Sequence, residues 1–319
     1  MKNIAVVGCG YWGKNLVRNF YELDALVAVC DPVETVAKKF SEQYGILAKT
    51  WEEVLEDKAI QGVVLAVPAV LHAKLCCEAI KAGKDVYVEK PLALTEEEGL
   101  QIKNTLKNSL QILLVGHLLQ YHPAVVKIKE LVKAGTLGDL RYIRSHRFNI
   151  GKIRHEENVL WSFAPHDFSV IHSIANSPIK AIHSHGQYLF DDDIADRVDV
   201  TIEFESGVQA EVCVSWVHPF KEQKLVVGCT KGMLVFDDTL PLDQKLKIYK
   251  HNYSRNGKNI ITEKAEPEPV ALDPTEPLKA ECQHFIDCMK DRQQPKTDIN
   301  EGMAVVRMLQ LAQKGLNSE

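Results

Sequence analysis

The chain opens with a short apolar run that ends in a glycine-rich turn. Residues 3–7 form the apolar run, residues 8–13 read Gly-Cys-Gly-Tyr-Trp-Gly, and residues 14–21 have helical periodicity. Glycines at these three positions permit a tight turn, a close approach of the backbone to a pyrophosphate, and close packing of helix on strand. The N-terminus of such a helix also attracts anions. The turn therefore predicts a dinucleotide-binding unit, with an ordinary tight turn as the alternative.

Strands and helices alternate over the first third of the chain. The strand-like segments are apolar on both faces, and amphipathic helical segments separate them. The expected strands are residues 3–7, 25–30, 62–66, 85–88 and 111–115, and the expected helices are residues 14–21, 34–44, 51–55, 71–82 and 95–108. This order predicts an α/β domain over residues 1–120, with a Rossmann-type doubly wound parallel sheet.

An acidic residue stands at the end of the second expected strand. Asp31 follows the glycine turn at about the separation at which a carboxylate binds the ribose diol of a dinucleotide. Pro32 follows it, and a carboxylate there would repel a 2′-phosphate. We therefore expect NAD in preference to NADP. The alternative is that Asp31 caps the next helix.

The pattern changes after about residue 118. A helical segment, residues 123–134, leads into an alternating segment at residues 140–148. Further strand-like runs follow at residues 179–189, 198–204, 207–216, 224–228, 233–237 and 245–249. Strands joined by short turns predict an α+β domain with a large, mainly antiparallel, open sheet.

The last part of the chain combines an extended arm with helices. Residues 264–277 are rich in Glu and Pro, whereas residues 277–289 and 300–314 have helical spacing. We assign residues 121–319 to a second domain for substrate binding and oligomerisation. Its C-terminal helices are candidates for packing back on the first domain. An open sheet face would suit a homodimer or homotetramer, although one sequence does not fix the number of subunits.

Composition limits the classes of partner. The 319 residues are 45% hydrophobic and 25% charged, with a net charge of −5, which fits a globular protein without a nucleic-acid surface. No apolar run approaches the roughly 20 residues that span a bilayer, and the first residues do not resemble a signal peptide. We expect a cytoplasmic protein with no membrane partner. Its eight cysteines lack metal-binding spacing, so we expect reduced thiols.

A lysine follows the strand expected at residues 85–88. The chain continues Glu89-Lys90-Pro91, and a side chain at the carboxyl end of a parallel strand points into the crevice where such sheets bind ligands. Pro91 would fix the turn that presents it. Taken alone, Lys90 would be a solvated surface charge, but beside a nucleotide-binding turn it becomes a candidate for the active site.

These motifs together resemble the glucose-fructose oxidoreductase/inositol dehydrogenase (Gfo/Idh/MocA) family. The resemblance runs along the whole chain and rests on residues 8–13, 67–72, 89–91, 116–124, 137–139 and 231–234. It implies an enzyme that moves a hydride between a nicotinamide and a carbon bearing a hydroxyl or ketone, usually on a sugar or cyclitol. Such chemistry needs no metal ion, because the nicotinamide accepts the hydride.

The resemblance also assigns residues to roles. The family's lysine falls on Lys90, and its Asp-x-x-x-His pair falls on Ser162 and His166, so the aspartate is absent here. Oxidation of a secondary alcohol needs a base and a cation near the oxygen, roles that His166 and Lys90 can fill. Asp167 would hold the loop or cap the following helix. The alternative for His166 is a structural residue near a helix N-terminus.

The cofactor and substrate residues follow from the same resemblance. The expected cofactor-binding residues are Gly8, Gly10, Tyr11, Trp12, Gly13, Asp31, Val67, Pro68, His72, Glu89 and Lys90. The expected substrate-binding residues are His117, Tyr121, Arg147, Lys152, Arg154, Trp161 and Ser162, with Arg144 as a further candidate for a diphosphate. A core position for Trp161 and solvation of the cations are the alternatives.

Three stretches are similar to the branch of the family that acts on nucleotide-linked amino sugars. These are residues 158–167, 276–287 and 298–302. The similarity implies oxidation at C3 of a UDP-linked N-acetylhexosamine, for later amination in polysaccharide or lipid A biosynthesis. One alternative is a dehydrogenase or ketoreductase for a free sugar, inositol or deoxysugar nucleotide. Another is a catalytically inactive NAD-binding sensor or regulatory subunit.

Overall fold

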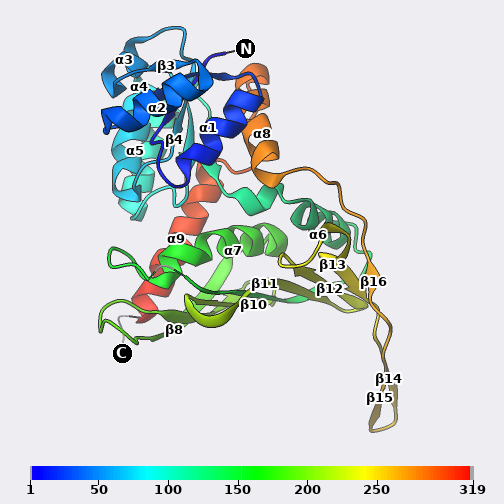
Figure 1. The fold of residues 1–319 in the computed structure, drawn as a ribbon. Coiled ribbons are helices and arrows are strands. Elements are labelled where there is room, and N and C mark those ends of the chain that lie inside the picture. The colour runs from blue at the N-terminus through cyan, green and yellow to red at the C-terminus, as the bar shows by residue number, and fades with distance from the viewer. Residues whose placement is uncertain (1, 152, 317–319) are drawn as a thin grey trace. The chain divides into compact units, whose positions relative to one another are not determined.

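The structure is a computed structural model that describes residues 2–151 and 153–316 (Figure 1). The chain forms two compact units. Unit 1 consists of residues 1–121 and 276–307, and unit 2 consists of residues 122–275 together with the residues from 308 onward. The chain passes between the units three times, and the third crossing lies within the last helix, α9 (Ile299–Leu316).

Unit 1 contains a six-stranded parallel sheet of order β3-β2-β1-β4-β5-β6. Its strands are β1 (Ile4–Val7), β2 (Leu26–Cys30), β3 (Leu47–Ala48), β4 (Gly62–Leu65), β5 (Asp85–Glu89) and β6 (Leu113–Gly116). The expected doubly wound parallel sheet is confirmed, and its strand order is that of a dinucleotide-binding fold. The short strand β3, which pairs only its two residues with β2, was not predicted.

Helices cover both faces of this sheet. The helices of unit 1 are α1 (Gly13–Glu22), α2 (Glu34–Tyr44), α3 (Trp51–Glu56), η1 (Ala69–Leu71), α4 (His72–Lys81), α5 (Glu96–Lys107), η2 (Leu118–Tyr121), α8 (Pro277–Asp291) and the first half of α9. Sequence signals explain their ends: Thr50 and Thr95 accept hydrogen bonds from the third backbone N–H of α3 and α5. One face buries apolar residues of α1 and α8, and the other buries those of α4 and α5.

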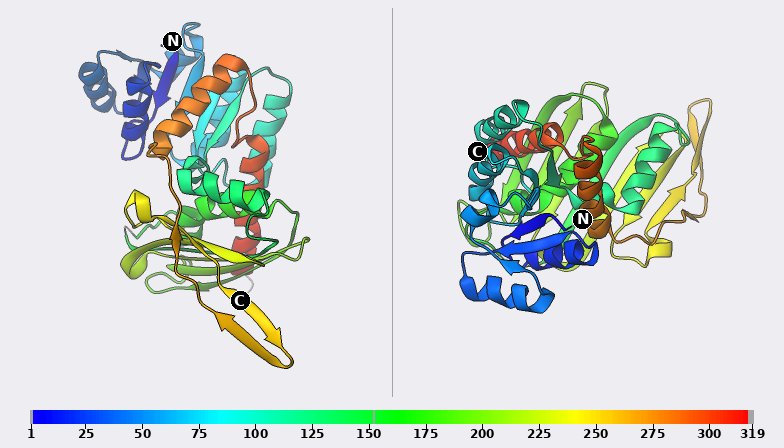
Figure 2. Two further views of the ribbon diagram at one scale, coloured as in Figure 1. Left: turned by 90° about the vertical axis from the view of Figure 1, so that its right-hand side faces the viewer. Right: turned by 90° about the horizontal axis from the view of Figure 1, so that it is seen from above.

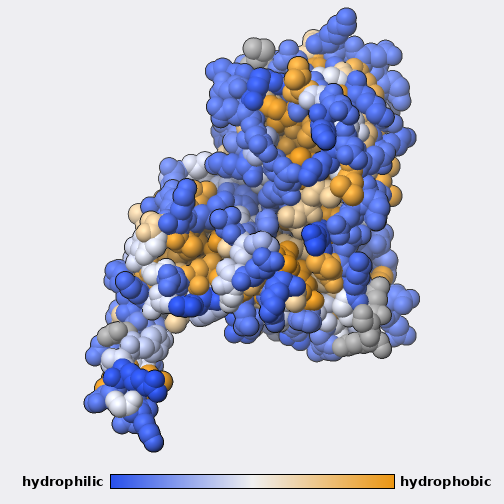
Figure 3. All heavy atoms as spheres, turned by 180° about the vertical axis from the view of Figure 1, so that it is seen from behind, coloured by the Kyte–Doolittle hydropathy of each residue, from blue (hydrophilic) through white to orange (hydrophobic). Residues whose placement is uncertain are grey.

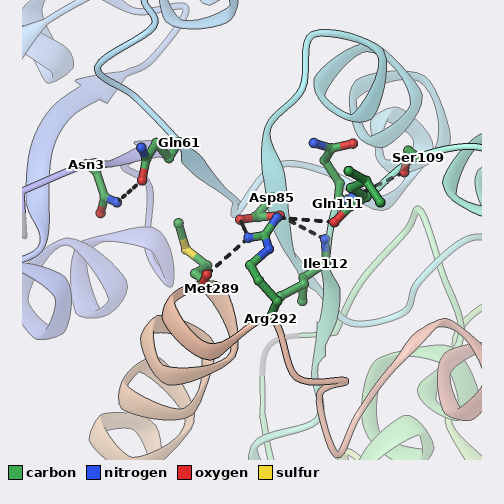
Figure 4. Close-up of polar contacts among 9 residues, drawn as sticks. Asn3, Gln61, Asp85, Ser109, Gln111, Ile112, Met289 and Arg292 are labelled. Carbon is green, nitrogen blue, oxygen red and sulfur yellow. Dashed lines mark hydrogen bonds and ion pairs between the residues drawn. The ribbon is translucent and has the colours of Figure 1, made fainter.

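Helix α8 is joined to the sheet by packing and by an ion pair. The rings of Phe20, Tyr87 and Phe285 meet edge to face, with centroids 5.9–6.3 Å apart. At the end of α8, Arg292 donates two hydrogen bonds, of 2.6 and 3.0 Å, to the carboxylate of Asp85 at the start of β5 (Figure 4). Residues about two hundred positions away in sequence therefore close one face of the sheet.

Unit 2 contains an eight-stranded sheet of order β16-β13-β12-β11-β7-β10-β9-β8. Its strands are β7 (Leu140–Ile150), β8 (Ile179–Gln187), β9 (Arg197–Phe204), β10 (Gln209–Ser215), β11 (Val217–Cys229), β12 (Gly232–Asp237), β13 (Leu246–Tyr249) and β16 (Glu268–Pro269). Only the pair of β10 with β7 is parallel among the described pairs of this sheet. The expected α+β architecture with a mainly antiparallel sheet is confirmed. Helix α7 (Val159–Ala175) packs on β7, β9 and β10, and α6 (Pro123–Lys133) packs on α7.

A two-stranded hairpin projects from unit 2 (Figures 1 and 2). Strands β14 (Asn252–Asn256) and β15 (Asn259–Glu263) pair with each other and form a separate sheet. Figure 3 shows the hairpin as mainly hydrophilic, and its exposed large apolar residues are Tyr253, Ile260 and Ile261. Its polar sequence lacks the apolar alternation of a strand, so it was not predicted.

Two further findings bear on the composition. None of the helices in the described ranges combines the length and the apolar character that crossing a membrane requires. All eight cysteines are unpaired, and all but Cys229 are buried.

Candidate active site

The glycines of the first turn have unequal surroundings. A Cβ on Gly8, whose φ is +87°, would lie 2.4 Å from the Ala66 carbonyl oxygen, and one on Gly13 would lie 1.9 Å from the Gly8 carbonyl oxygen. A Cβ on Gly10 would meet no atom within 4 Å. Gly8 and Gly13 therefore allow the close approach of β1, α1 and the end of β4. Gly10 instead leaves its backbone open to an approaching group, as a pyrophosphate requires.

The helix after this turn presents an open N-terminus. Helix α1 begins at Gly13, has no acidic residue in its first turn and receives no side-chain cap from Trp12. Its first backbone N–H groups and the positive end of its dipole therefore suit an anion. Tyr11 is exposed, and the Lys14 ammonium lies 5.1 Å from the centre of its ring. These features fit the phosphate groups of a dinucleotide.

Asp31 follows β2 and lies beside the glycine turn. Its Oδ2 accepts a 2.8 Å hydrogen bond from the Cys9 N–H, and its Oδ1 accepts a 2.9 Å hydrogen bond from the Val33 N–H. The second bond holds the N–H of Val33, the residue directly before α2, although no side chain caps that helix. The first fixes the carboxylate against the glycine turn, and each oxygen keeps acceptor capacity for a ribose hydroxyl.

Val67 and Pro68 follow β4, and His72 begins α4. The His72 ring is only 1% exposed, with Nδ1 2.7 Å from the Pro91 carbonyl oxygen and Nε2 3.0 Å from the Val67 carbonyl oxygen. Burial lowers the pKa of His72, and a neutral imidazole can donate to only one of these two acceptors. His72 therefore joins the loops that follow β4 and β5 and does not project into open space.

Glu89 and Lys90 stand at the carboxyl end of β5. The buried Glu89 carboxylate accepts a 2.6 Å hydrogen bond from the Trp12 indole Nε1 and a 3.3 Å hydrogen bond from the Lys90 N–H. Burial raises the pKa of Glu89, while the Trp12 bond and the Lys90 charge oppose this rise. The Lys90-Pro91 peptide bond is cis. Glu89 thus ties the lysine-bearing strand end to the glycine turn.

His117 and Tyr121 follow β6 and lie in the interior of unit 1. His117 is completely buried; its Nδ1 lies 2.6 Å from Glu301 Oε2, and its Nε2 has no hydrogen-bond partner. The buried Tyr121 hydroxyl lies 3.0 Å from the Thr297 hydroxyl. Both side chains were predicted to line the substrate pocket, and the structure holds both in contacts with α9 or the segment before it.

Helix α7 carries the residues predicted for the second half of the site. Asn158 caps it by accepting a hydrogen bond from the Trp161 N–H, and the helix continues through Pro165 to Ala175. Pro165 lacks the N–H that would bond the carbonyl four residues earlier, so the helix lacks one bond directly before His166. Ser162 and His166 are four residues apart and share one helix face.

Asp167 does not have the role that we expected from the sequence. It lies within α7, is buried, and neither caps a helix nor holds a loop. Its carboxylate accepts hydrogen bonds from Arg147 Nε at 2.7 Å, Arg147 Nη2 at 3.1 Å and Ser145 Oγ at 2.6 Å. Asp167 raises the pKa of Arg147 against the opposing effect of burial. Arg147 is thus paired with a carboxylate of its own unit.

The other predicted substrate residues of unit 2 have partners too. Arg144 pairs with Glu211 at 3.2 Å, and Arg154 pairs with Glu157 at 2.8 Å. The Trp161 indole Nε1 donates a 3.0 Å hydrogen bond to Gln313 Oε1. Lys152 lies outside the described residues. The structure thus brings the predicted cofactor residues together in unit 1, while Ser162 and His166 stand on a helix of unit 2.

Sequence reasoning missed two acids of unit 1, the buried Glu281 and the partly exposed Glu301. Glu281 lies on the buried face of α8 with Leu278, Cys282 and Phe285, and it accepts a 2.8 Å hydrogen bond from the Tyr87 hydroxyl. An acid on the apolar stripe of a predicted helix was the available signal. Its partner Tyr87 could not be inferred, because the two residues are far apart in sequence.

The comparisons with known proteins agree with this architecture. Residues 2–117 match the family described as "Oxidoreductase family, NAD-binding Rossmann fold", and residues 125–235 match the "GFO/IDH/MocA C-terminal domain". The chain is 28% identical over 321 residues to scyllo-inositol 2-dehydrogenase (NAD(+)) of Bacillus subtilis (strain 168), covering 93% of this chain and 89% of that protein.

Two solved structures share the fold along almost the whole chain. UDP-N-acetylglucosamine 3-dehydrogenase GnnA from Acidithiobacillus ferrooxidans superposes with a TM-score of 0.87 at 20% identity, covering 99% of this chain and 98% of that one. GenD2 from gentamicin A biosynthesis, in complex with NAD, superposes with a TM-score of 0.81 at 22% identity, covering 99% and 94%. At these identities, the likeness concerns the fold.

Proposed function

The chain belongs to the Gfo/Idh/MocA oxidoreductase family with an NAD-binding Rossmann domain, and from that premise we propose that it oxidises C3 of a UDP-linked N-acetylhexosamine to a ketone. The observation that carries the proposed chemistry is the strand end at Glu89 and Lys90. Glu89 bonds Trp12 of the glycine turn, so the backbone of Lys90 is fixed beside the cofactor loop. Bound NAD would supply the hydride acceptor.

In this proposal, different residues of the chain assist the proton transfer and bind the cofactor. The Lys90 ammonium favours the negative charge that develops on the substrate oxygen, and His166 takes the hydroxyl proton. Ser162, one turn before His166, stands where the resembled family has an acid, and its hydroxyl orients the substrate or a water. The backbone of the glycine turn and the N-terminus of α1 hold the pyrophosphate, and Asp31 holds the ribose.

The proposed sugar nucleotide rests on the resemblance of the segment from Asn158 to Asp167, and the likeness to GnnA agrees with it. It does not rest on Arg147, because that guanidinium is paired with Asp167. The whole-length similarity to an inositol dehydrogenase favours a second candidate, the oxidation of inositol or a free sugar. The two candidates differ in whether the substrate carries a nucleotide.

A substrate screen separates these candidates. UDP-N-acetylglucosamine, UDP-N-acetylgalactosamine, UDP-glucose, N-acetylglucosamine and scyllo-inositol are each incubated with NAD or NADP, with a dye-coupled reaction to draw off the reduced cofactor. We expect turnover with NAD and a UDP-N-acetylhexosamine. Analysis of the product should then find a ketone at C3 of the sugar. Turnover of free sugars or inositols alone would defeat the nucleotide-sugar proposal. Binding of NAD without turnover of any sugar would favour the sensor alternative.

Variants test the catalytic roles in the same assay. Lys90→Ala and His166→Ala should each lower kcat by about 10²–10⁴-fold, whereas Lys81→Ala, on the exposed end of α4, and His172→Gln, on the same helix as His166, serve as matched controls. If the two residues act on one proton transfer, the double variant should lose little more than either single variant. Unchanged kcat in both single variants would exclude the proposed roles. Ser162→Ala and Ser162→Asp then decide whether that hydroxyl participates.

A further inference from the structure

A buried acid of unit 1, Glu281, has no counter-ion among the residues that the structure describes. Glu281 is 0% exposed and lies on the buried face of α8 that also carries Phe285, whose ring packs edge to face on those of Phe20 and Tyr87. Its Oε2 accepts the 2.8 Å hydrogen bond from Tyr87, and its Oε1 has no hydrogen-bond partner. No basic side chain of the described residues forms an ion pair with it. An ionised carboxylate in such a place would be costly, because neither water nor a cation compensates its charge.

The Tyr87 hydroxyl connects this acid to the proposed cofactor site. The same oxygen lies 3.4 Å from Glu89 Oε1, and Glu89 accepts the shorter bond from Trp12 Nε1. Tyr87 and Glu89 are two residues apart on β5 and therefore share a sheet face. Gly116 of the neighbouring strand leaves room for both, since a Cβ there would lie 3.0 Å from the Tyr87 hydroxyl and 3.1 Å from Glu89 Oε1.

The single hydrogen of the Tyr87 hydroxyl limits how many of the neighbouring carboxyl groups can be ionised. Tyr87 has one hydroxyl hydrogen, and its shorter contact is with Glu281, so it cannot serve two ionised carboxylates equally. The other titratable groups that act on Glu281 are Glu89 on β5 and Glu301 on α9, both acids. Lys90 and His117 are positioned to act on Glu89 instead. Repulsion is relieved if one of the two carboxyl groups keeps its proton.

Glu281 is the group better suited to keep that proton. Burial and the two neighbouring acids raise the pKa of Glu281, and only the Tyr87 bond opposes this rise. Burial also raises the pKa of Glu89, but Trp12, Lys90 and His117 all favour its charged form. Tyr121 and Cys282, which face the same interior, supply no positive charge.

We propose that Glu281 is a positioning residue that stays a neutral carboxylic acid. Its own hydrogen then occupies the 2.8 Å contact with the Tyr87 oxygen, which leaves the Tyr87 hydrogen to point to the ionised Glu89 and hold it for its bond to Trp12. The position of Trp12, and of Lys90 directly after Glu89, then depends on a residue of helix α8. This role rests on the proposed function in one respect, since it takes the Trp12 and Lys90 region as the NAD site.

The protonation is tested without any ligand. Infrared spectra of the whole protein near neutral pH should contain the carbonyl-stretch band of a buried protonated carboxylic acid, and Glu281→Gln should abolish it. Tyr87→Phe should shift the band by removing its hydrogen bond. Glu276→Gln, a partly exposed acid directly before α8, is the matched control and should leave the band in place. A band that disappears in Glu89→Gln and persists in Glu281→Gln would overturn the assignment, as would the absence of a band.

The positioning role is tested by NAD titration, followed by tryptophan fluorescence or calorimetry. Glu281→Gln mimics the neutral acid and should keep NAD affinity within about twofold, whereas Glu281→Leu and Tyr87→Phe should weaken it roughly 3- to 10-fold, the effect of one hydrogen bond. The KM for NAD should rise more than kcat falls. If Glu281→Leu does not fold, as judged by circular dichroism, Tyr87→Phe decides.

The outcomes separate this inference from the proposed function. Unchanged NAD affinity in Tyr87→Phe, or an equal loss in Glu281→Gln and Tyr87→Phe, would overturn the positioning role. Wild-type protein that binds no NAD would overturn the proposed function and the positioning role together. The infrared band would still decide the protonation of Glu281 in that case.

Discussion

Strand β5 begins at one buried acid, Asp85, and ends at another, Glu89, and the surroundings of these acids differ. At the amino end, Arg292 binds both Asp85 oxygens, and a backbone N–H donates a third hydrogen bond (Figure 4). At the carboxyl end, Glu89 faces a second acid, Glu281, across the hydroxyl of Tyr87. One edge of the sheet is thus neutralised by a cation, whereas the other gathers acids in its interior.

The two edges differ in their charges because the amino edge holds α8 against the sheet, whereas the carboxyl edge is where parallel sheets bind ligands. Burial raises the pKa of Asp85, and Arg292 opposes this rise, so the pair closes α8 against the sheet with little net charge. Ligands of parallel sheets bind at the carboxyl edge, where side chains must also keep definite positions for a cofactor. There, a neutral acid and a hydroxyl can orient groups without adding a cation that would compete with Lys90.

The largest expected effect comes from the two kinds of glycine at the carboxyl edge. Gly13→Ala should lower the free energy of unfolding by more than about 3 kcal/mol, because its Cβ would overlap the Gly8 carbonyl oxygen. Gly10→Ala should change it by less than about 1 kcal/mol but weaken NAD binding about tenfold, because its methyl would occupy the open side of the turn. Urea unfolding and NAD titration measure the two effects. Equal losses of stability in both variants would contradict the distinction.

The features of this edge that depend on local sequence could be predicted. The apolar strands, the glycine turn, Asp31 and Lys90 each follow from residues adjacent in the chain, and the Rossmann-type sheet that they predict is confirmed. The alternating run at residues 140–148 likewise predicts β7, which the structure extends to Leu140–Ile150. Short-range periodicity carries this information, because backbone geometry alone determines which side chains share a face.

The features that depend on distant pairs could not be predicted. Arg147 was expected to bind a diphosphate, yet it meets Asp167 because β7 and α7 pack together. Asp167 was expected to hold a loop or to cap the following helix, whereas it lies inside α7. Glu281 is buried because α8 returns to the first sheet. Each of these outcomes requires knowing which elements are neighbours, which a single sequence does not specify.

A smaller effect is expected at the amino edge. Arg292→Met should lower the free energy of unfolding by about 2–3 kcal/mol, because Asp85 would stay buried without its cation; the value is moderated by the 48% exposure of the Arg292 side chain. The matched control is Arg18→Met, whose pair with Glu276 is partly exposed on both sides and should contribute less than about 1 kcal/mol. NAD affinity should not change in either variant. A loss of NAD affinity in Arg292→Met would break the division of roles between the two edges.

The smallest effect, taken per pH unit, is a change in how stability depends on pH. The pKa of Glu281 is raised in the folded protein by burial and by neighbouring acids. Above about pH 5 the unfolded chain releases this proton, since its carboxyl has an ordinary pKa near 4.3, while the folded protein keeps it. Folding then binds a proton, so wild-type stability should fall as pH rises, by up to about 1.4 kcal/mol per pH unit from this group, until the folded pKa is passed.

Glu281→Gln removes that dependence and leaves the other acids in place. The variant should lie within about 1 kcal/mol of wild type at pH 5 and become relatively more stable toward pH 8, because Gln pays no cost of staying neutral. Urea unfolding of both proteins across this pH range gives the difference in their free energies of unfolding as a function of pH. Asp85 and Glu89 titrate in both proteins, so their contributions cancel in that difference. A difference that is flat, or that falls with rising pH, would mean that Glu281 is ionised in the folded protein. The carboxyl edge would then hold two buried charges, those of Glu89 and Glu281. The two edges would differ only because Asp85 has a cation, Arg292, as its partner and these two acids do not.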